Sequence, residues 1–180
     1  METIAKTRMA TMWLSGCSGC HMSFLDLDES LIDLAKKVQI VYSPIADVKV
    51  FPENVDVTLI EGAVGDEEQL ELLKKAREQS KILVSFGDCA VTGNVPALRN
   101  AFEDGDNAVL QRAYIENVDV NPQIPNDVPK LLKKVRPLHE IVKIDYYIPG
   151  CPPPSDIISY VLTELLSGRT PNMEGRSRYG

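Results

Sequence analysis

Two thiols separated by two residues are the part of this sequence best suited to chemistry. They are Cys17 and Cys20, in the segment LSGCSGCH (residues 14–21), which follows an apolar run. Thiolates at this spacing can chelate one metal centre. The glycines before them, Gly16 and Gly19, let the backbone turn sharply and aim N–H groups at sulfur. The segment therefore predicts a site for an inorganic cofactor.

The sequence has two further cysteines, and each lies in a loop of similar composition. Cys89 follows the apolar run 81–86, and Cys151 follows the strand-like stretch 144–148. All four thiols thus come just after an expected strand. Because ligands of an open parallel sheet collect at the carboxyl ends of its strands, we expect these widely separated cysteines to converge there.

The composition is that of a globular protein with one core. The chain has 180 residues, 44% of them hydrophobic and 25% charged, and no repeat or linker divides it. We therefore expect a single domain over residues 1–180. The formal net charge of −7 argues against a nucleic acid or an anionic membrane as the main partner.

The sequence also bears on location. No apolar run approaches the roughly 20 residues of a membrane span, and residues 1–8 do not resemble an export leader, so we expect a cytoplasmic protein. In that reducing compartment, four cysteines favour metal ligation or redox chemistry over two disulfides.

Strand and helix patterns alternate along the chain. Strands are expected at residues 8–14, 38–42, 55–60, 81–86 and 144–148, and helices at residues 24–35, 66–79 and 155–168. Ser155 is the expected N-cap of the last helix. The alternation predicts an α/β three-layer sandwich with a mostly parallel, flavodoxin-like sheet. The proline-rich segment 94–137 and the polar tail 169–180 fall outside this pattern, and we interpret them as docking surfaces.

Four thiols suit either structural zinc or an iron-sulfur cluster, because both accept four thiolates in a tetrahedral array. Zinc sites usually combine two CxxC knuckles, whereas here one CxxC is followed by two lone cysteines far along the chain. This arrangement favours a cuboidal 4Fe-4S cluster, although spacing alone does not exclude a zinc-stapled interaction protein. A thioredoxin-type dithiol is a third interpretation, but it leaves Cys89 and Cys151 unexplained.

Four motifs in a fixed order resemble those of one known family. They are GCSGC at residues 16–20, EGA at 61–63, GDC at 87–89 with Gly93 following, and PGCPP at 149–153. Together they resemble the small subunit of nickel-iron hydrogenases. The stretch CSGCHMSFLDLDE and the short length most resemble the cytoplasmic, bidirectional, NAD-reducing type. The resemblance implies that the proximal 4Fe-4S cluster is ligated by Cys17, Cys20, Cys89 and Cys151.

The same resemblance implies that separate subunits hold the different cofactors. The nickel-iron centre would lie in a separate large subunit, and this chain would pass electrons between that centre and a diaphorase module carrying flavin and further clusters. Relatives that are exported or membrane-bound carry a leader and a C-terminal domain with two more clusters, and we find neither pattern here. The related 20-kDa-class subunit of respiratory complex I is an alternative, but its first loop has adjacent cysteines, whereas Ser18 and Gly19 separate them here.

We also predict roles or positions for four residues other than the cysteines. Glu61 ends a strand at the same sheet edge, and we hypothesise a proton-relay role for it, the alternative being a solvated or helix-capping carboxylate. Asp88 is expected to hold its loop by hydrogen bonds to backbone N–H groups. His21 is expected to orient the loop or lie at an interface, since four cysteines complete the ligand set, and Trp13 is expected in the core.

FMN is an alternative cofactor, because flavodoxin-like sheets can bind it. FMN in that fold needs a hydroxyl-rich phosphate loop after the first strand, and here the cysteine segment takes that place. The acidic run 66–68 is interpreted as a helix start rather than a metal site.

Overall fold

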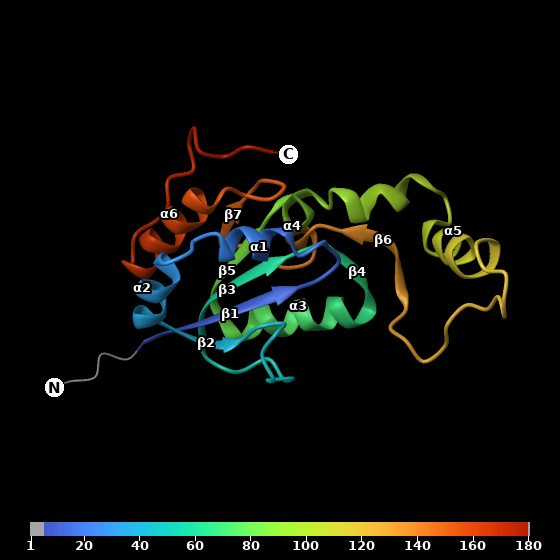
Figure 1. Ribbon diagram of the computed structural model, residues 1–180, viewed down its shortest axis with the longest axis horizontal. Coiled ribbons are helices and arrows are strands. Elements are labelled where there is room, and N and C mark those ends of the chain that lie inside the picture. The colour runs from blue at the N-terminus through green and yellow to red at the C-terminus, as the bar shows by residue number, and fades with distance from the viewer. Residues whose placement is uncertain (1–5, 180) are drawn as a thin grey trace.

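A five-stranded parallel sheet forms the centre of the structure, a computed structural model that describes residues 6–179 (Figure 1). The strand order is β2-β1-β3-β5-β7, and every neighbouring pair is parallel. The strands are β1 (Thr7–Trp13), β2 (Val38–Tyr42), β3 (Val55–Glu61), β5 (Ser80–Phe86) and β7 (Tyr146–Ile148). This is the flavodoxin-like order, and it confirms the predicted fold class.

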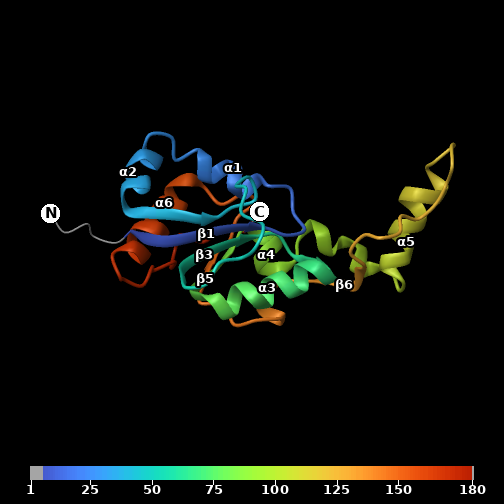
Figure 2. The same cartoon turned by 90° about the horizontal axis from the view of Figure 1, so that it is seen from below.

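Helices cover both faces of the sheet (Figure 2). One face carries α1 (Gly19–Leu25), α2 (Ser30–Lys37) and α6 (Ser155–Leu166), and the other carries α3 (Glu67–Gln79), α4 (Asp88–Thr92) and the short η3 (Leu138–Glu140). Successive strand residues alternate between two cores: Leu83 packs beneath α3, and Val84 packs beneath α6. Because both faces are covered, the strands are apolar almost throughout, as expected of a buried parallel sheet.

The proline-rich segment 94–137, which falls outside the predicted strand and helix pattern, forms an extension of the sandwich. It contains η1 (Val95–Ala101), α5 (Gly105–Gln111), η2 (Arg112–Glu116) and β6 (Leu131–Arg136). The short strand β4 (Val64–Asp66) pairs antiparallel with β6. Neither β4 nor β6 was predicted, because each is short and is stabilised by the other. In both views α5 lies far from the parallel sheet, and we call residues 102–130 the arm.

The single helix expected at residues 24–35 is two helices, and that prediction was wrong. A turn at residues 26–29 separates α1 from α2, and Asp28 has a positive φ of 48°. Aspartate enters the left-handed region more easily than most residues. The like-charged Asp26 and Glu29, three residues apart, would also repel each other on one continuous helix.

Two boundaries differ from the prediction near the C-terminus. Pro154 is the N-cap of α6 and Ser155 is its first residue, with no side-chain cap, so the expected Ser155 cap was wrong. The last strand begins at Tyr146 instead of residue 144. The N–H of Leu83 in β5 donates to the side-chain carboxylate of Asp145 at 2.8 Å. This side-chain contact replaces a backbone hydrogen bond between β5 and the chain that enters β7.

Within residues 6–179, no helix is both long enough and apolar enough to cross a membrane.

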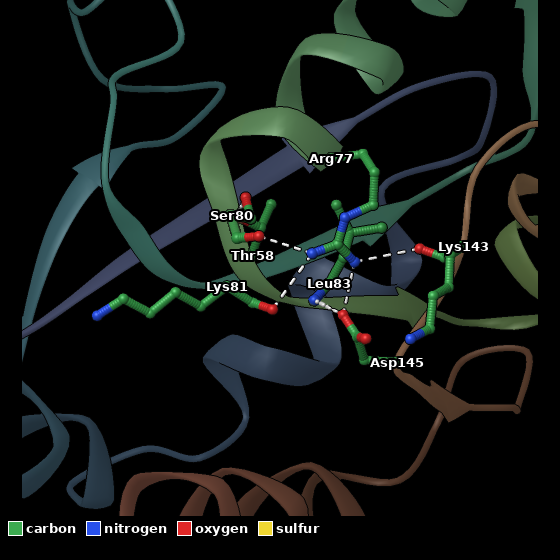
Figure 3. A network of polar contacts seen from close by, with 7 residues as sticks. All are labelled: Thr58, Arg77, Ser80, Lys81, Leu83, Lys143 and Asp145. Carbon is green, nitrogen blue, oxygen red and sulfur yellow. Dashed lines mark hydrogen bonds and ion pairs between the residues drawn. The ribbon is translucent and has the colours of Figure 1, made fainter.

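One arginine joins three elements at the amino end of β5 (Figure 3). Arg77, near the end of α3, donates to the carboxylate of Asp145 at 2.6 Å. It also donates to the carbonyls of Ser80 at 2.6 Å, Lys143 at 3.1 Å and Lys81 at 3.2 Å. The guanidinium therefore connects the α3–β5 junction to the segment that enters β7.

Replacing Arg77 by Met keeps the aliphatic stem but removes every donor in this network. A half-buried carboxylate and several carbonyls lose their partner, so we expect the free energy of unfolding to fall by about 1–3 kcal/mol. Urea unfolding of the full chain measures this. The control Lys74→Met, which removes an exposed ion pair with Glu71 on the same helix, should change the value by less than about 0.5 kcal/mol. Equal losses in the two variants would contradict the special role of Arg77.

Candidate metal centre

The first cysteine loop is fixed to the end of β3 by backbone hydrogen bonds. Ser15 and Ala63 exchange two N–H···O bonds of 2.9 and 2.8 Å, and the N–H of Leu14 donates to the carbonyl of Glu61 at 2.9 Å. Gly62 between them has φ +89°. A Cβ at Gly62 would collide with the backbone of Leu14 and Ser15. The EGA motif therefore braces the loop that carries the first two thiols, and only glycine fits at its centre.

The second and third cysteine loops are joined to each other by one buried aspartate. Asp88 is 3% exposed. Its carboxylate accepts the N–H of Gly150 at 2.6 Å, and its own N–H donates to the Gly150 carbonyl at 2.9 Å. Cys89 and Cys151 are the next residues after this pair. The expectation that Asp88 bonds to backbone N–H groups is confirmed, and its partner lies in the other loop.

The four thiols come together at the carboxyl ends of β1, β5 and β7. A cavity of about 90 Å³ is lined by all four cysteines, the carboxylates Glu61 and Asp88, and three residues without charge. Cys20 is buried and Cys89 is partly buried, whereas Cys17 and Cys151 are exposed, and all four are free thiols. The structure thus places all the predicted ligands around one cavity that opens to the surface.

The electrostatic surroundings disfavour free thiolates. Burial raises the pKa of the Cys20 thiol, and the nearby carboxylate of Glu61 and the other three cysteines raise it further. Burial also raises the pKa of Cys89, with added contributions from Cys151 and Cys17, against a hydrogen bond from the backbone of Val95 that lowers it. A positively charged group in the cavity would lower these thiol pKa values again, because a metal cation deprotonates a thiol that coordinates it.

A single ion and a cluster require different arrangements of thiols. Among residues 6–179, no three histidine, cysteine or acidic side chains are arranged to hold one metal ion. A tetrahedral zinc with Zn–S bonds of about 2.3 Å needs its sulfurs within about 4 Å of one another. A cuboidal cluster binds each thiolate at a different iron and therefore accepts a wider array. Four thiols around one cavity are a donor set that an iron-sulfur cluster accepts.

Beside the thiols lies a histidine–glutamate pair that sequence reasoning did not find. Glu61, 2% exposed, accepts from the backbone N–H of His21 at 2.9 Å, and the same oxygen lies 2.5 Å from His21 Nδ1. The His21 ring packs edge-on against Trp13 and Phe86, and its Nε2 is buried without a hydrogen-bond partner among the described residues. The pair fixes the first turn of α1, in which Cys20 lies, to the end of β3. The expected orienting role of His21 thus has a structural basis.

Trp13 is not a core residue, contrary to the prediction. Its side chain is 40% exposed. It lies at the end of β1 beside His21 of α1, and it lines a hollow of about 290 Å³ with almost no polar surface. Exposed apolar residues surround this hollow, namely Met22, Leu25, Ile40 and Ile45. An apolar surface of this kind next to the thiols is typical of a contact with another protein.

Comparison with known proteins places this geometry in a family. Residues 17–165 match the family described as "NADH ubiquinone oxidoreductase, 20 Kd subunit". The chain is 45% identical over 170 residues to the NAD-reducing hydrogenase HoxS subunit delta of Cupriavidus necator, covering 91% of this chain and 80% of that protein. The chain belongs to the family of nickel-iron hydrogenase small subunits, of the NAD-reducing type. The resemblance seen in the sequence is therefore confirmed.

Solved structures agree with this assignment. A chain of an NAD+-reducing [NiFe]-hydrogenase in the H2-reduced state superimposes with a TM-score of 0.92 at 42% identity, covering 98% of this chain and all of that one. A chain of the [NiFeSe]-hydrogenase of Dm. baculatum has a TM-score of 0.61 at 15% identity, which shows a shared fold.

Other relatives are longer than this chain. One of them is a polypeptide of the F420-non-reducing hydrogenase of Methanothermobacter marburgensis, to which the chain is 40% identical over 170 residues. The chain spans only 54% of that protein's length. The shared part covers 91% of this chain.

A substitution at Gly87 tests whether the position of the Cys20 sulfur is critical for the metal centre. It has φ +83°, and a Cβ there would overlap the sulfur of Cys20. We expect Gly87→Ala to displace Cys20 and to lower the iron content of anaerobically purified protein by more than half. Gly175→Ala is the matched control, because Gly175 also has a positive φ, +69°, but no atom lies within 4 Å of the added Cβ. Full iron content in Gly87→Ala would show that the sulfur position is not critical.

Proposed function

We propose that the chain is the electron-transfer small subunit of an NAD-reducing nickel-iron hydrogenase and holds one proximal 4Fe-4S cluster. Its ligands are Cys17, Cys20, Cys89 and Cys151. The observation that carries the proposal is that thiols from three separate strand ends line one cavity. The cluster, when bound, supplies one-electron redox chemistry.

The surrounding residues have distinct tasks in this proposal. Cys20 and the braced loops around it exclude water from the inner side of the site, since Cys20 is only 8% exposed. Exposed Cys17 and Cys151 bring the outer side to the protein surface. Electron transfer to another subunit requires the cluster to lie close to the surface that this subunit contacts. We therefore expect the partner to dock on the side where Cys17 and Cys151 are exposed.

The partners we propose are a large subunit with the nickel-iron centre and diaphorase subunits with flavin and further clusters. The similarity to the HoxS subunit delta of Cupriavidus necator, a subunit of an NAD-reducing hydrogenase, supports this. We also propose that the chain acts as one domain in the cytoplasm, without nucleic-acid or membrane partners, in keeping with its net charge of −7.

Of the two docking surfaces expected from the sequence, the arm and the adjoining η1 are the better supported. Val95, Leu98 and Phe102 expose large apolar side chains there. The tail is engaged within the chain: Arg169 pairs with Glu164 at 2.6 Å, and the guanidinium of Arg176 lies 4.4 Å from the ring centre of Tyr160. Those two arginines are therefore less free to bind a partner.

Anaerobic purification tests the cluster directly. We expect brown protein with broad absorbance near ~400 nm and about four iron and four sulfide per chain. Cys89→Ser should lower both contents, whereas Ser159→Ala, a substitution on α6 away from the thiols, should not. Colourless protein with one zinc per chain would support the zinc-stapled interaction protein instead.

FMN is the second candidate cofactor, favoured by the flavodoxin-like strand order. The hollow beside Trp13 is adjacent to the loop where flavodoxins bind the phosphate. The hollow has almost no polar surface, and Cys17 and Cys20 occupy the loop that would hold the phosphate. For this reason the cluster is the one cofactor that we propose.

Glu61 is proposed as a proton-relay residue, since it is a buried carboxylate that lines the cavity and contacts His21. Glu61→Gln keeps an acceptor for the His21 N–H but cannot carry a proton. We expect hydrogen oxidation by the purified complex to fall by about 10²-fold with an unchanged cluster spectrum. Exposed Glu68→Gln on α3 is the control and should retain full turnover. Unchanged turnover in Glu61→Gln would leave Glu61 with the bracing role alone.

A further inference from the structure

One side chain in the turn that follows α4 reaches a cysteine of another loop. The side-chain amide of Asn94 donates to the sulfur of Cys151, with Nδ2 and Sγ 3.6 Å apart. The turn follows the helix that contains Cys89, whereas Cys151 follows β7. This hydrogen bond therefore connects two of the three thiol-bearing loops.

The backbone of this turn is held in an unusual conformation. Asn94 has φ 34° and ψ −130°, a region that residues other than glycine rarely occupy. Gly93 before it has φ +89°, and its N–H caps α4 by donating to the Cys89 carbonyl at 3.0 Å. The carbonyl of Asn94 accepts from Ala97 at 3.0 Å in the first turn of η1. Strain of this kind persists where neighbouring structure enforces it, often at functional sites.

We propose that Asn94 sets the reduction potential of the cluster by its hydrogen bond to the Cys151 sulfur. The inference rests on the proposed function, since it requires the cluster. An N–H···S bond stabilises the more negative, reduced state of a cluster more than the oxidised state, and so raises its potential. Asn94 is a positioning and tuning residue in this scheme and not a ligand.

The placement of Asn94 makes this effect specific. Cys151 is an exposed ligand, and exposed sulfurs are the ones whose hydrogen bonds solvent can otherwise supply. A fixed amide from the protein replaces variable water contacts with one defined donor. The sulfur nearest to the surface thus keeps a constant environment when a partner approaches.

Two substitutions distinguish the effect of the Asn94 side-chain amide from the effect of the Asn94 backbone conformation. Asn94→Gly removes the donor and accepts the positive φ more easily than asparagine. Asn94→Asp keeps the shape but presents a carboxylate oxygen in place of the N–H. Asn121→Gly is the matched control, because Asn121 also has a positive φ, 52°, but lies in the arm.

The experiment is a redox titration of the full chain, purified anaerobically and followed by electron paramagnetic resonance. We expect a more negative midpoint potential in Asn94→Gly, a still more negative one in Asn94→Asp, and no shift in Asn121→Gly. Pulsed measurements on the reduced cluster should also show one exchangeable proton coupling that both Asn94 variants lack.

The outcomes are distinguishable. Unshifted potentials in both Asn94 variants with intact clusters would overturn the proposal about Asn94 while leaving the cluster itself in place. Loss of the cluster in both variants would also overturn it, because Asn94 would then be needed to hold the loop and not to set the potential. Absence of any cluster in the unaltered chain would instead refute the proposed function.

Discussion

The parallel register of four strands is the constraint on which the metal centre depends. Trp13 at the end of β1 pairs with Glu61 of β3, Glu61 pairs with Phe86 of β5, and Phe86 pairs with Ile148 of β7. These residues form one row across the sheet, and each cysteine loop leaves the sheet just beyond it. A slip of one residue in any pair would turn core residues to the wrong face, so burial of both faces enforces the register. The thiols meet because the strands cannot shift.

The loops beyond that row are stabilised mainly by backbone hydrogen bonds and by two buried carboxylates. Asp88 joins loops that are 62 residues apart in the sequence, and Glu61 joins the start of α1 to β3. Neither lysine nor arginine lines the cavity. A cavity of thiols and carboxylates without cations is unfavourable for thiolates, as the raised pKa values of Cys20 and Cys89 show. It suits a group that brings its own positive charge.

Sequence patterns located the long strands and α3 within a residue or two, because those segments are strongly apolar or have a well-capped start. Asp66 does cap α3, accepting from the N–H of Gln69 at 2.8 Å. The patterns failed where tertiary neighbours decide. The helical periodicity of residues 24–35 hides a turn at Asp28, and Trp13 is exposed because the α1 side chains beside it leave a hollow instead of covering it. The strands β4 and β6 are too short to be recognised without each other.

By itself, the sequence determined the types of the candidate ligands, their position after strands, the order of the motifs and hence the family. These are properties of local composition and spacing, which a linear chain displays directly. Only the tertiary structure decided which groups surround the thiols: the contact of His21 with Glu61, the bond from Asn94 to Cys151, and the pairing of Asp88 with Gly150. Such hydrogen bonds join residues far apart in the chain and require placement within a few tenths of an ångström. That placement follows from packing across the whole sheet and not from any single segment.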